Sequence, residues 1–140
     1  INQNRYSIFD RTIESNGLKD TAARLHKGII TFSPLAQGLL TDRYLHGIPA
    51  DSRVHTDGRF LKETDLTQEK LAKIRALNEM AAARGQTLAE MALAWLLSHE
   101  EITTVLIGAS KTQQILDNIK AVQNTSFTAE ELAEIDRISK

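Results

Sequence analysis

Apolar residues recur three and four positions apart in several parts of the chain, which is the spacing of one helical face. The clearest case is the segment from 67 to 84, which ends before Gly85. Thr87 with Glu90, and Thr128 with Glu131, have the spacing of capping boxes that begin two further helices. The pattern predicts five helices in all, over residues 18–27, 67–84, 88–99, 111–122 and 129–139.

Short apolar runs predict strands between these helices. The runs IITF (29–32) and TTVLIG (103–108) are typical of strands buried on both faces, and the N-terminus carries a strand remnant. Strands that alternate with helices predict a parallel sheet with helical crossovers. Three strands cannot close a barrel. We therefore expect one partial domain over residues 1–140, from a larger α/β protein, and the start without Met also suggests a fragment.

Composition narrows the class of protein. The chain has 140 residues, a net charge of −1 and no cysteine. The balanced charge disfavours a nucleic-acid partner, and no apolar run reaches the length of a membrane span. A chain without cysteine has no disulfide or zinc–thiolate site, and it fits a reducing compartment, so we expect a cytoplasmic protein. The four histidines show no spacing typical of a metal site.

Two turns that follow predicted strands are candidate ligand sites, because ligands of parallel sheets bind beyond the carboxyl ends of the strands. One turn covers residues 33–38 and the other covers residues 108–111. Backbone N–H groups at such turns suit an anion. The cations that could add charge-assisted hydrogen bonds to a phosphate are Arg43, Arg53 and Lys111.

Each of these signals also has a purely structural interpretation. Ser110 could simply cap its helix. Gln114, Asp117 and Asn118 share one helical face, where they could bind a heteroaromatic base or only meet water. Phe32 could stack on a planar ring or fill the core. The spacing of the residues leaves these alternatives open.

Four segments together resemble the C-terminal half of the aldo-keto reductases, in the branch of L-glyceraldehyde 3-phosphate reductase and the potassium-channel β-subunits. These segments are QNRYSIFDR, FSPLAQGLLTDRYLHGIPADSR, GQTLAEMALAWLL and VLIGASKTQQILDNIKAV. The resemblance implies a (β/α)8 TIM barrel, to which this chain contributes about strands 6 to 8 and the closing helices. It also implies the cofactor NADP(H) and a small-molecule carbonyl substrate, and it leaves a homo-oligomer open.

The resemblance assigns roles at the nicotinamide and pyrophosphate. It matches Gln3 to the side chain that binds the carboxamide, and Phe32 to the aromatic residue under the nicotinamide ring. Arg43 aligns with a Lys near the pyrophosphate, and Arg53 with an Arg near the adenosine end. The segment beside the pyrophosphate is matched by Ser33, Pro34, Leu35, Ala36 and Gly38.

At the adenosine end, the resemblance matches Gly108 and Ser110 to the loop around the adenosine phosphate. Ser110, Lys111 and Arg53 are then expected to meet a 2′-phosphate, together with Gln114, which stands where many relatives have Arg. Asp117 and Asn118 match a Glu-Asn pair that contacts adenine. The long polar loop over residues 45–66, which carries Arg53, is expected to fold over the cofactor.

The family's catalytic Asp, Tyr, Lys and His belong to its N-terminal half, so the resemblance assigns no catalytic residue to this chain. Three hypotheses follow. The chain is the cofactor-binding half of an NADPH-dependent reductase of aldehydes or ketones, with L-glyceraldehyde 3-phosphate as one candidate substrate. Alternatively, it belongs to a cofactor-sensing regulatory subunit that resembles the channel β-subunits. The third hypothesis is an isolated interaction module.

Overall fold

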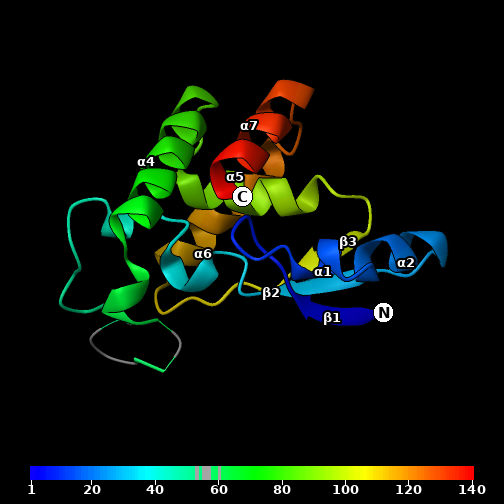
Figure 1. Ribbon diagram of the computed structural model, residues 1–140, viewed down its shortest axis with the longest axis horizontal. Helices are drawn as coiled ribbons and strands as arrows, with labels where there is room; N and C mark the ends of the chain where they lie inside the picture. Colours follow the sequence, from blue (N-terminus) through cyan, green and yellow to red (C-terminus); the bar gives the residue numbers. More distant parts are fainter. Residues whose placement is uncertain (53, 55–57, 60) are drawn as a thin grey trace.

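The computed structural model describes residues 1–52, 54, 58–59 and 61–140. Helices follow strands along the chain and cover one face of a small sheet (Figure 1). Within the described residues, no helix combines the length and the apolar character that crossing a membrane requires. The strands and α-helices are β1 (Asn2–Arg5), α1 (Thr12–Ser15), α2 (Leu18–Arg24), β2 (Ile29–Phe32), α4 (Gln68–Ala83), α5 (Leu88–Leu97), β3 (Ile102–Val105), α6 (Thr112–Asn118) and α7 (Ala129–Ser139).

The three strands form one parallel sheet in the order β1-β2-β3. The parallel sheet predicted from the sequence is therefore confirmed. Its register pairs Arg5 with Phe32 and Thr31 with Val105, so all three strands end at the same edge. Short 3₁₀ segments, η1 (Ala36–Gly38) and η2 (Asp42–Tyr44), follow β2, and η3 (Glu63–Asp65) precedes α4.

Most predicted helices begin and end close to the observed positions, but α2 ends at Arg24 rather than at residue 27, and α1 was not predicted. Both capping boxes are formed: Thr87 accepts from the Glu90 N–H and Thr128 from the Glu131 N–H, each at 3.1 Å. The predicted helix over 111–122 is in fact two segments, because α6 ends at Asn118 and tightens into the 3₁₀ segment η4 (Ile119–Gln123).

The prediction that two strands are buried on both faces is wrong. In β2, Ile29 and Thr31 are buried, whereas Ile30 and Phe32 on the other face are half-buried. β3 starts at Ile102 and ends at Val105, so Leu106 and Ile107 lie outside the strand and are exposed. The reason is the open sheet: helices cover only one face of the three strands.

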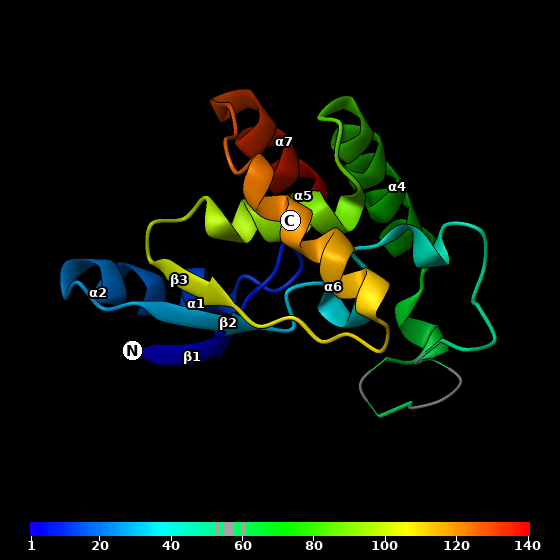
Figure 2. The ribbon, with the colours of Figure 1, turned by 180° about the vertical axis from the view of Figure 1, so that it is seen from behind.

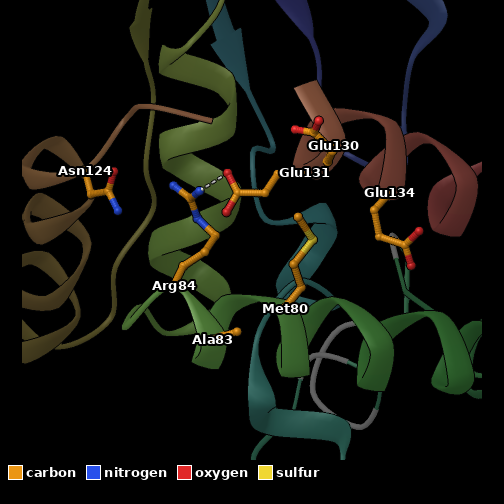
Figure 3. Close-up of a pocket in the computed structure, with 7 residues that line it drawn as sticks. All are labelled: Met80, Ala83, Arg84, Asn124, Glu130, Glu131 and Glu134. Atoms are coloured by element: carbon orange, nitrogen blue, oxygen red, sulfur yellow. Dashed lines mark hydrogen bonds and ion pairs between the residues drawn. The ribbon is translucent and has the colours of Figure 1, made fainter. Parts of the chain in front are cut away.

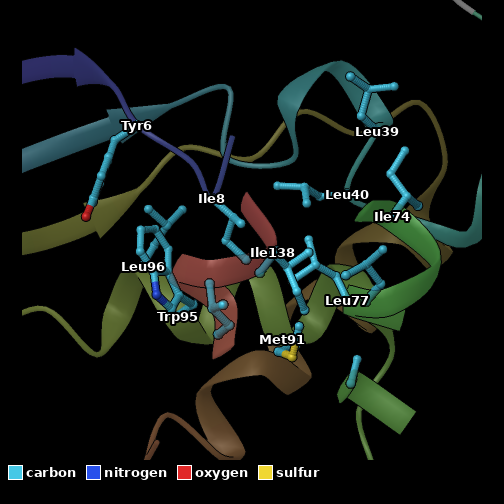
Figure 4. Close-up of a cluster of buried hydrophobic side chains, with 14 of the residues drawn as sticks. Tyr6, Ile8, Leu39, Leu40, Ile74, Leu77, Met91, Trp95, Leu96 and Ile138 are labelled. Carbon is cyan, nitrogen blue, oxygen red and sulfur yellow. The ribbon is translucent and has the colours of Figure 1, made fainter. Parts of the chain in front are cut away.

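The core lies between the sheet and helices α4, α5 and α7 (Figure 4). α5 lies at its centre, since every residue from Met91 to Leu96 is buried. Trp95 is 1% exposed, which confirms the interpretation of this residue as core. Its indole contacts Tyr6 and His99, with ring centroids 5.1 and 4.6 Å away, and Arg11 stacks on it at 4.2 Å.

Candidate functional site

The two predicted ligand turns lie at the same edge of the sheet. The Leu106 N–H donates to the Thr31 carbonyl oxygen at 2.8 Å, which holds the ends of β2 and β3 together. From that edge, one turn continues into η1 and the other into α6, and the two run side by side (Figures 1 and 2). The geometry therefore agrees with the rule that places ligand sites beyond the carboxyl ends of parallel strands.

The turn after β2 has an unusual backbone. Ser33, Ala36 and Gln37 all have left-handed φ values, of 53°, 49° and 61°, and His26 is the one other non-glycine residue of this kind in the described part of the chain. Such conformations cost free energy, and they concentrate at sites where the backbone must take a specific path. Gly38, with φ 93°, continues the turn at lower cost.

Packing holds this turn against the helices. Pro34 is buried, and Leu35 packs against the small cluster formed by Leu93 and Ala94 of α5 with Ala121 of η4. The Gln37 amide also donates to the Ser33 hydroxyl at 3.2 Å. Since the packing fixes the turn, its backbone path is set before any ligand arrives.

Arg43 and Arg53 were both predicted near the phosphates. The Arg43 guanidinium donates to the Asp51 carboxylate at 2.8 Å and to the Asp51 carbonyl oxygen at 3.0 Å. Its Nε atom is buried and has no hydrogen-bond partner within the described residues. Arg53 lies outside the described residues.

At the start of α6, the purely structural interpretation of Ser110, in which it caps the helix, is wrong. Lys111 is the N-cap residue, and the Gln114 Oε1 atom accepts from the N–H groups of Ser110 (2.8 Å) and Lys111 (3.2 Å). The Ser110 hydroxyl donates to the same oxygen at 3.3 Å. Gln114 thus orders this turn itself, and Gly108, Ser110 and Lys111 are exposed.

The predicted adenine-contacting pair lies further along α6. The Asp117 carboxylate accepts from Gln113 and from Lys120, both at 2.9 Å, and Asn118 ends the helix half-buried. The hydrogen bonds from Lys120 and Gln113 hold the pKa of the Asp117 carboxyl below its usual value. The carboxylate is therefore charged near neutral pH, and its partners lie in α6 and in the adjoining segment η4.

Gln3 and Phe32 share the open face of the sheet. Gln3 pairs with Ile30 in the register and is exposed, and Phe32 stands two residues beyond Ile30 on β2. Because side chains alternate between faces, Gln3, Ile30 and Phe32 point the same way. The half-buried Phe32 ring is thus accessible to a planar ligand from this face.

A second group of titratable side chains lies between the sheet, α5 and the N-terminal helices. The buried Tyr6 hydroxyl donates to the Glu14 carboxylate at 2.5 Å and lies 3.2 Å from His99 Nε2. Lys19 Nζ lies 3.3 Å from His99 Nδ1. Burial, and then the hydrogen bond to Glu14, raises the pKa of Tyr6 far above its usual value. A tyrosine held in this way is a poor proton donor, so we interpret the group as structural.

His99 makes this group sensitive to acid. Burial, followed by the nearby charge of Lys19, lowers the pKa of His99 to about 4, and Glu14, Glu101 and Arg11 are the other charged groups near the ring. Since the unfolded chain binds a proton on His99 near pH 6.5, stability is lost as the pH falls from about 6.5 towards 4. After a discount for partial exposure of the ring, we expect a loss of about 2 kcal/mol in the free energy of unfolding.

Urea unfolding at pH 7, 6, 5 and 4.5 measures this loss. In His99→Gln, the free energy of unfolding should change little with pH above pH 4.5. In His26→Gln, which changes an exposed histidine, it should depend on pH as in the unmodified protein. A His99→Gln protein with an unchanged pH dependence would contradict the assignment.

A hollow of the described structure lies elsewhere, between α4 and α7 (Figure 3). It encloses about 410 Å³ and is lined by Met80, Ala83, Arg84, Asn124, Glu130, Glu131 and Glu134. The Arg84–Glu131 ion pair of 2.6 Å stands in it. Because none of the predicted site residues lines it, this hollow is separate from the candidate site. The described residues also contain no group of three side chains suited to a metal ion.

Comparison with known proteins agrees with this arrangement. The family model described as "Aldo/keto reductase family" matches residues 1–140. The chain belongs to the aldo/keto reductase family. It is 49% identical over 140 residues to L-glyceraldehyde 3-phosphate reductase of Escherichia coli O157:H7, and 35% identical over 124 residues to a probable voltage-gated potassium channel subunit beta of Oryza sativa subsp. japonica.

These aldo/keto reductase relatives are longer proteins. The matches cover 98% and 87% of this chain, but 40% and 38% of the E. coli and rice proteins. Among solved structures, an aldo-keto reductase from Bacillus halodurans in its holo form matches all of this chain and 43% of its own, with a TM-score of 0.73 and 28% identity. The three-stranded parallel sheet with its helices is therefore part of the TIM barrel of this family, as the resemblance implied.

Proposed function

We propose that this chain forms the cofactor-binding part of an NADPH-dependent aldo-keto reductase, which reduces an aldehyde or ketone to an alcohol. One observation carries the proposal. The two turns that the family resemblance assigns to the cofactor phosphates leave the sheet side by side at the carboxyl ends of β2 and β3. Parallel α/β folds bind their ligands at that edge.

The residues present fit an extended dinucleotide. Left-handed backbone at Ser33, Ala36 and Gln37 gives the first turn a fixed, costly path, which a binding role would explain. The Nε atom of Arg43, in the segment η2 that follows this turn, is buried and has no hydrogen-bond partner among the described residues, and a phosphate oxygen would satisfy it. Phe32 offers an accessible ring for the nicotinamide, and Gln3 offers an amide on the same face.

Bound NADPH would supply the hydride, and this chain's residues would hold and orient it. Ser33, Pro34, Leu35, Ala36 and Gly38 would line the pyrophosphate, while Gly108, Ser110, Lys111, Gln114, Asp117 and Asn118 would bind the adenosine end. Arg53 is assigned to that end by the resemblance alone. No catalytic residue is assigned to this chain. We also propose a cytoplasmic location and a small carbonyl compound as substrate.

The cofactor preference provides a test. Lys111 is exposed at the start of α6, and its ammonium group is available for the 2′-phosphate that distinguishes NADPH from NADH. Since a charge-assisted hydrogen bond contributes about 1.5–3 kcal/mol, Lys111→Ala should weaken NADPH binding about 10- to 100-fold. NADH binding should change little. Fluorescence titration of the full natural protein measures both dissociation constants.

The matched control is Lys27→Ala, which removes an exposed lysine at the amino end of β2, away from the site. It should leave both affinities unchanged. Equal affinity of the unmodified protein for NADPH and NADH would overturn the preference, and absence of NADPH oxidation with every aldehyde tested would overturn the reductase proposal.

A second candidate is a cofactor-sensing regulatory subunit, favoured by the 35% identity to the rice potassium-channel subunit. Such a protein would bind NADPH with the same preference but turn it over very slowly. Single-turnover measurement of NADPH oxidation, compared with the binding titration, separates the two candidates.

A further inference from the structure

Arg5, the last residue of β1, lies beside Phe32 on the open face of the sheet. The register pairs the two residues across the parallel strands, and the Arg5 Cζ atom lies 5.7 Å from the centroid of the Phe32 ring. Residues paired in this way point to the same face. Arg5 therefore stands next to the ring that is proposed to support the nicotinamide, where hydride transfer would take place.

The charge of Arg5 is unpaired within the described part of the chain, and its side chain is exposed. Arginines in structural roles here have carboxylate partners: Arg11 pairs with Asp136 at 2.9 Å and Arg84 with Glu131 at 2.6 Å. Arg5 instead contacts an aromatic face, which leaves the N–H donors at the edge of its guanidinium available. Those donors form a planar fork that matches a phosphate or carboxylate.

We propose that Arg5 binds the phosphate of a phosphorylated carbonyl substrate and so determines the substrate class of the enzyme. The inference rests on the proposed reductase function. Binding an anionic substrate group beside the nicotinamide requires a local cation. Arg5 is such a cation beside the proposed nicotinamide position. The similarity to an L-glyceraldehyde 3-phosphate reductase supports a phosphate rather than a carboxylate.

The test uses the full natural protein and a matched pair of substrates, L-glyceraldehyde 3-phosphate and L-glyceraldehyde. Arg5→Gln should lower kcat/KM for the phosphorylated aldehyde about 10- to 100-fold, mainly through KM. The value for the uncharged aldehyde should stay within about 2-fold. Arg5→Lys should restore part of the loss, because it keeps the charge without the planar fork. Arg24→Gln, at an exposed arginine on α2, is the control.

Two further measurements separate this inference from the reductase proposal. Calorimetric titration with glycerol 3-phosphate and with glycerol detects phosphate binding without turnover, and Arg5→Gln should weaken only the former. The dissociation constant of NADPH should be the same in Arg5→Gln and the unmodified protein. Equal losses for both aldehydes, weaker NADPH binding, or unchanged glycerol 3-phosphate binding would each overturn the role of Arg5. A protein that binds glycerol 3-phosphate through Arg5 but oxidises no NADPH would support it while contradicting the reductase.

Discussion

Trp95→Ala is expected to lower the free energy of unfolding by about 3–5 kcal/mol. The indole is 1% exposed in the centre of α5, and three side chains pack directly on it. Removing it leaves a large cavity and also deprives the Arg11 guanidinium of the ring on which it stacks at 4.2 Å. Since whole domains are stable by only about 5–15 kcal/mol, much of the protein's stability depends on this one side chain.

Urea unfolding followed by circular dichroism measures the loss. Leu25→Ala is the matched control, because Leu25 is another large apolar residue but is 50% exposed. The urea concentration at the midpoint of unfolding of Leu25→Ala should stay close to that of the unmodified protein. If Trp95→Ala and Leu25→Ala unfold at the same urea concentration, α5 is not the centre of the core.

Arg84→Met should destabilise the protein by about 2 kcal/mol, because it removes a nearly buried guanidinium and its charge-assisted hydrogen bonds, while the 27% exposed Glu131 keeps access to water. The Arg84 side chain is 5% exposed, donates to Glu131 at 2.6 Å and to the Ser126 carbonyl oxygen at 2.9 Å, and stacks on Phe127 at 3.8 Å. Methionine keeps much of the aliphatic packing but none of the donors, so the measured change reports the guanidinium.

Arg137→Met is the control for this change. Arg137 pairs with Glu134 at 2.5 Å, but its side chain is 70% exposed, so water can replace the lost partner. Its melting temperature should stay close to the original value, whereas that of Arg84→Met should fall. Equal shifts in the two variants would show that burial does not strengthen the Arg84 pair.

Local signals in the sequence were sufficient for the parallel sheet and for the longer helices, but they missed α1 (Thr12–Ser15). The capping boxes at Thr87 and Thr128 predicted two helix starts correctly, because each depends on residues only three positions apart. The length and burial of β3 were predicted less well. An apolar run such as TTVLIG has the same pattern whether or not something covers its second face, and here Leu106 and Ile107 are exposed.

For the candidate site, the family resemblance assigned roles to residues whose function the spacing alone left open. The structure added backbone conformations and side-chain contacts, which neither source could predict. The left-handed backbone of Ser33, Ala36 and Gln37 has no signature in residue type, since none of the three is glycine. The use of Gln114 to order its own turn depends on side-chain conformation. The sequence alone did not indicate Arg5 as a site residue, because its position beside Phe32 depends on the pairing of two strands that are distant in the sequence.

The anchoring of α7 has a consequence for synthesis on the ribosome. This helix forms ion pairs with distant parts of the chain: Asp136 pairs with Arg11, and Glu131 pairs with Arg84. Its buried residues Ile135 and Ile138 complete the core that α4 and α5 line. Because residues 129–139 are translated after every element on which they pack, the nascent chain holds that apolar surface uncovered until α7 leaves the exit tunnel. During this interval, a chaperone that recognises apolar helical surface would have its best opportunity to bind.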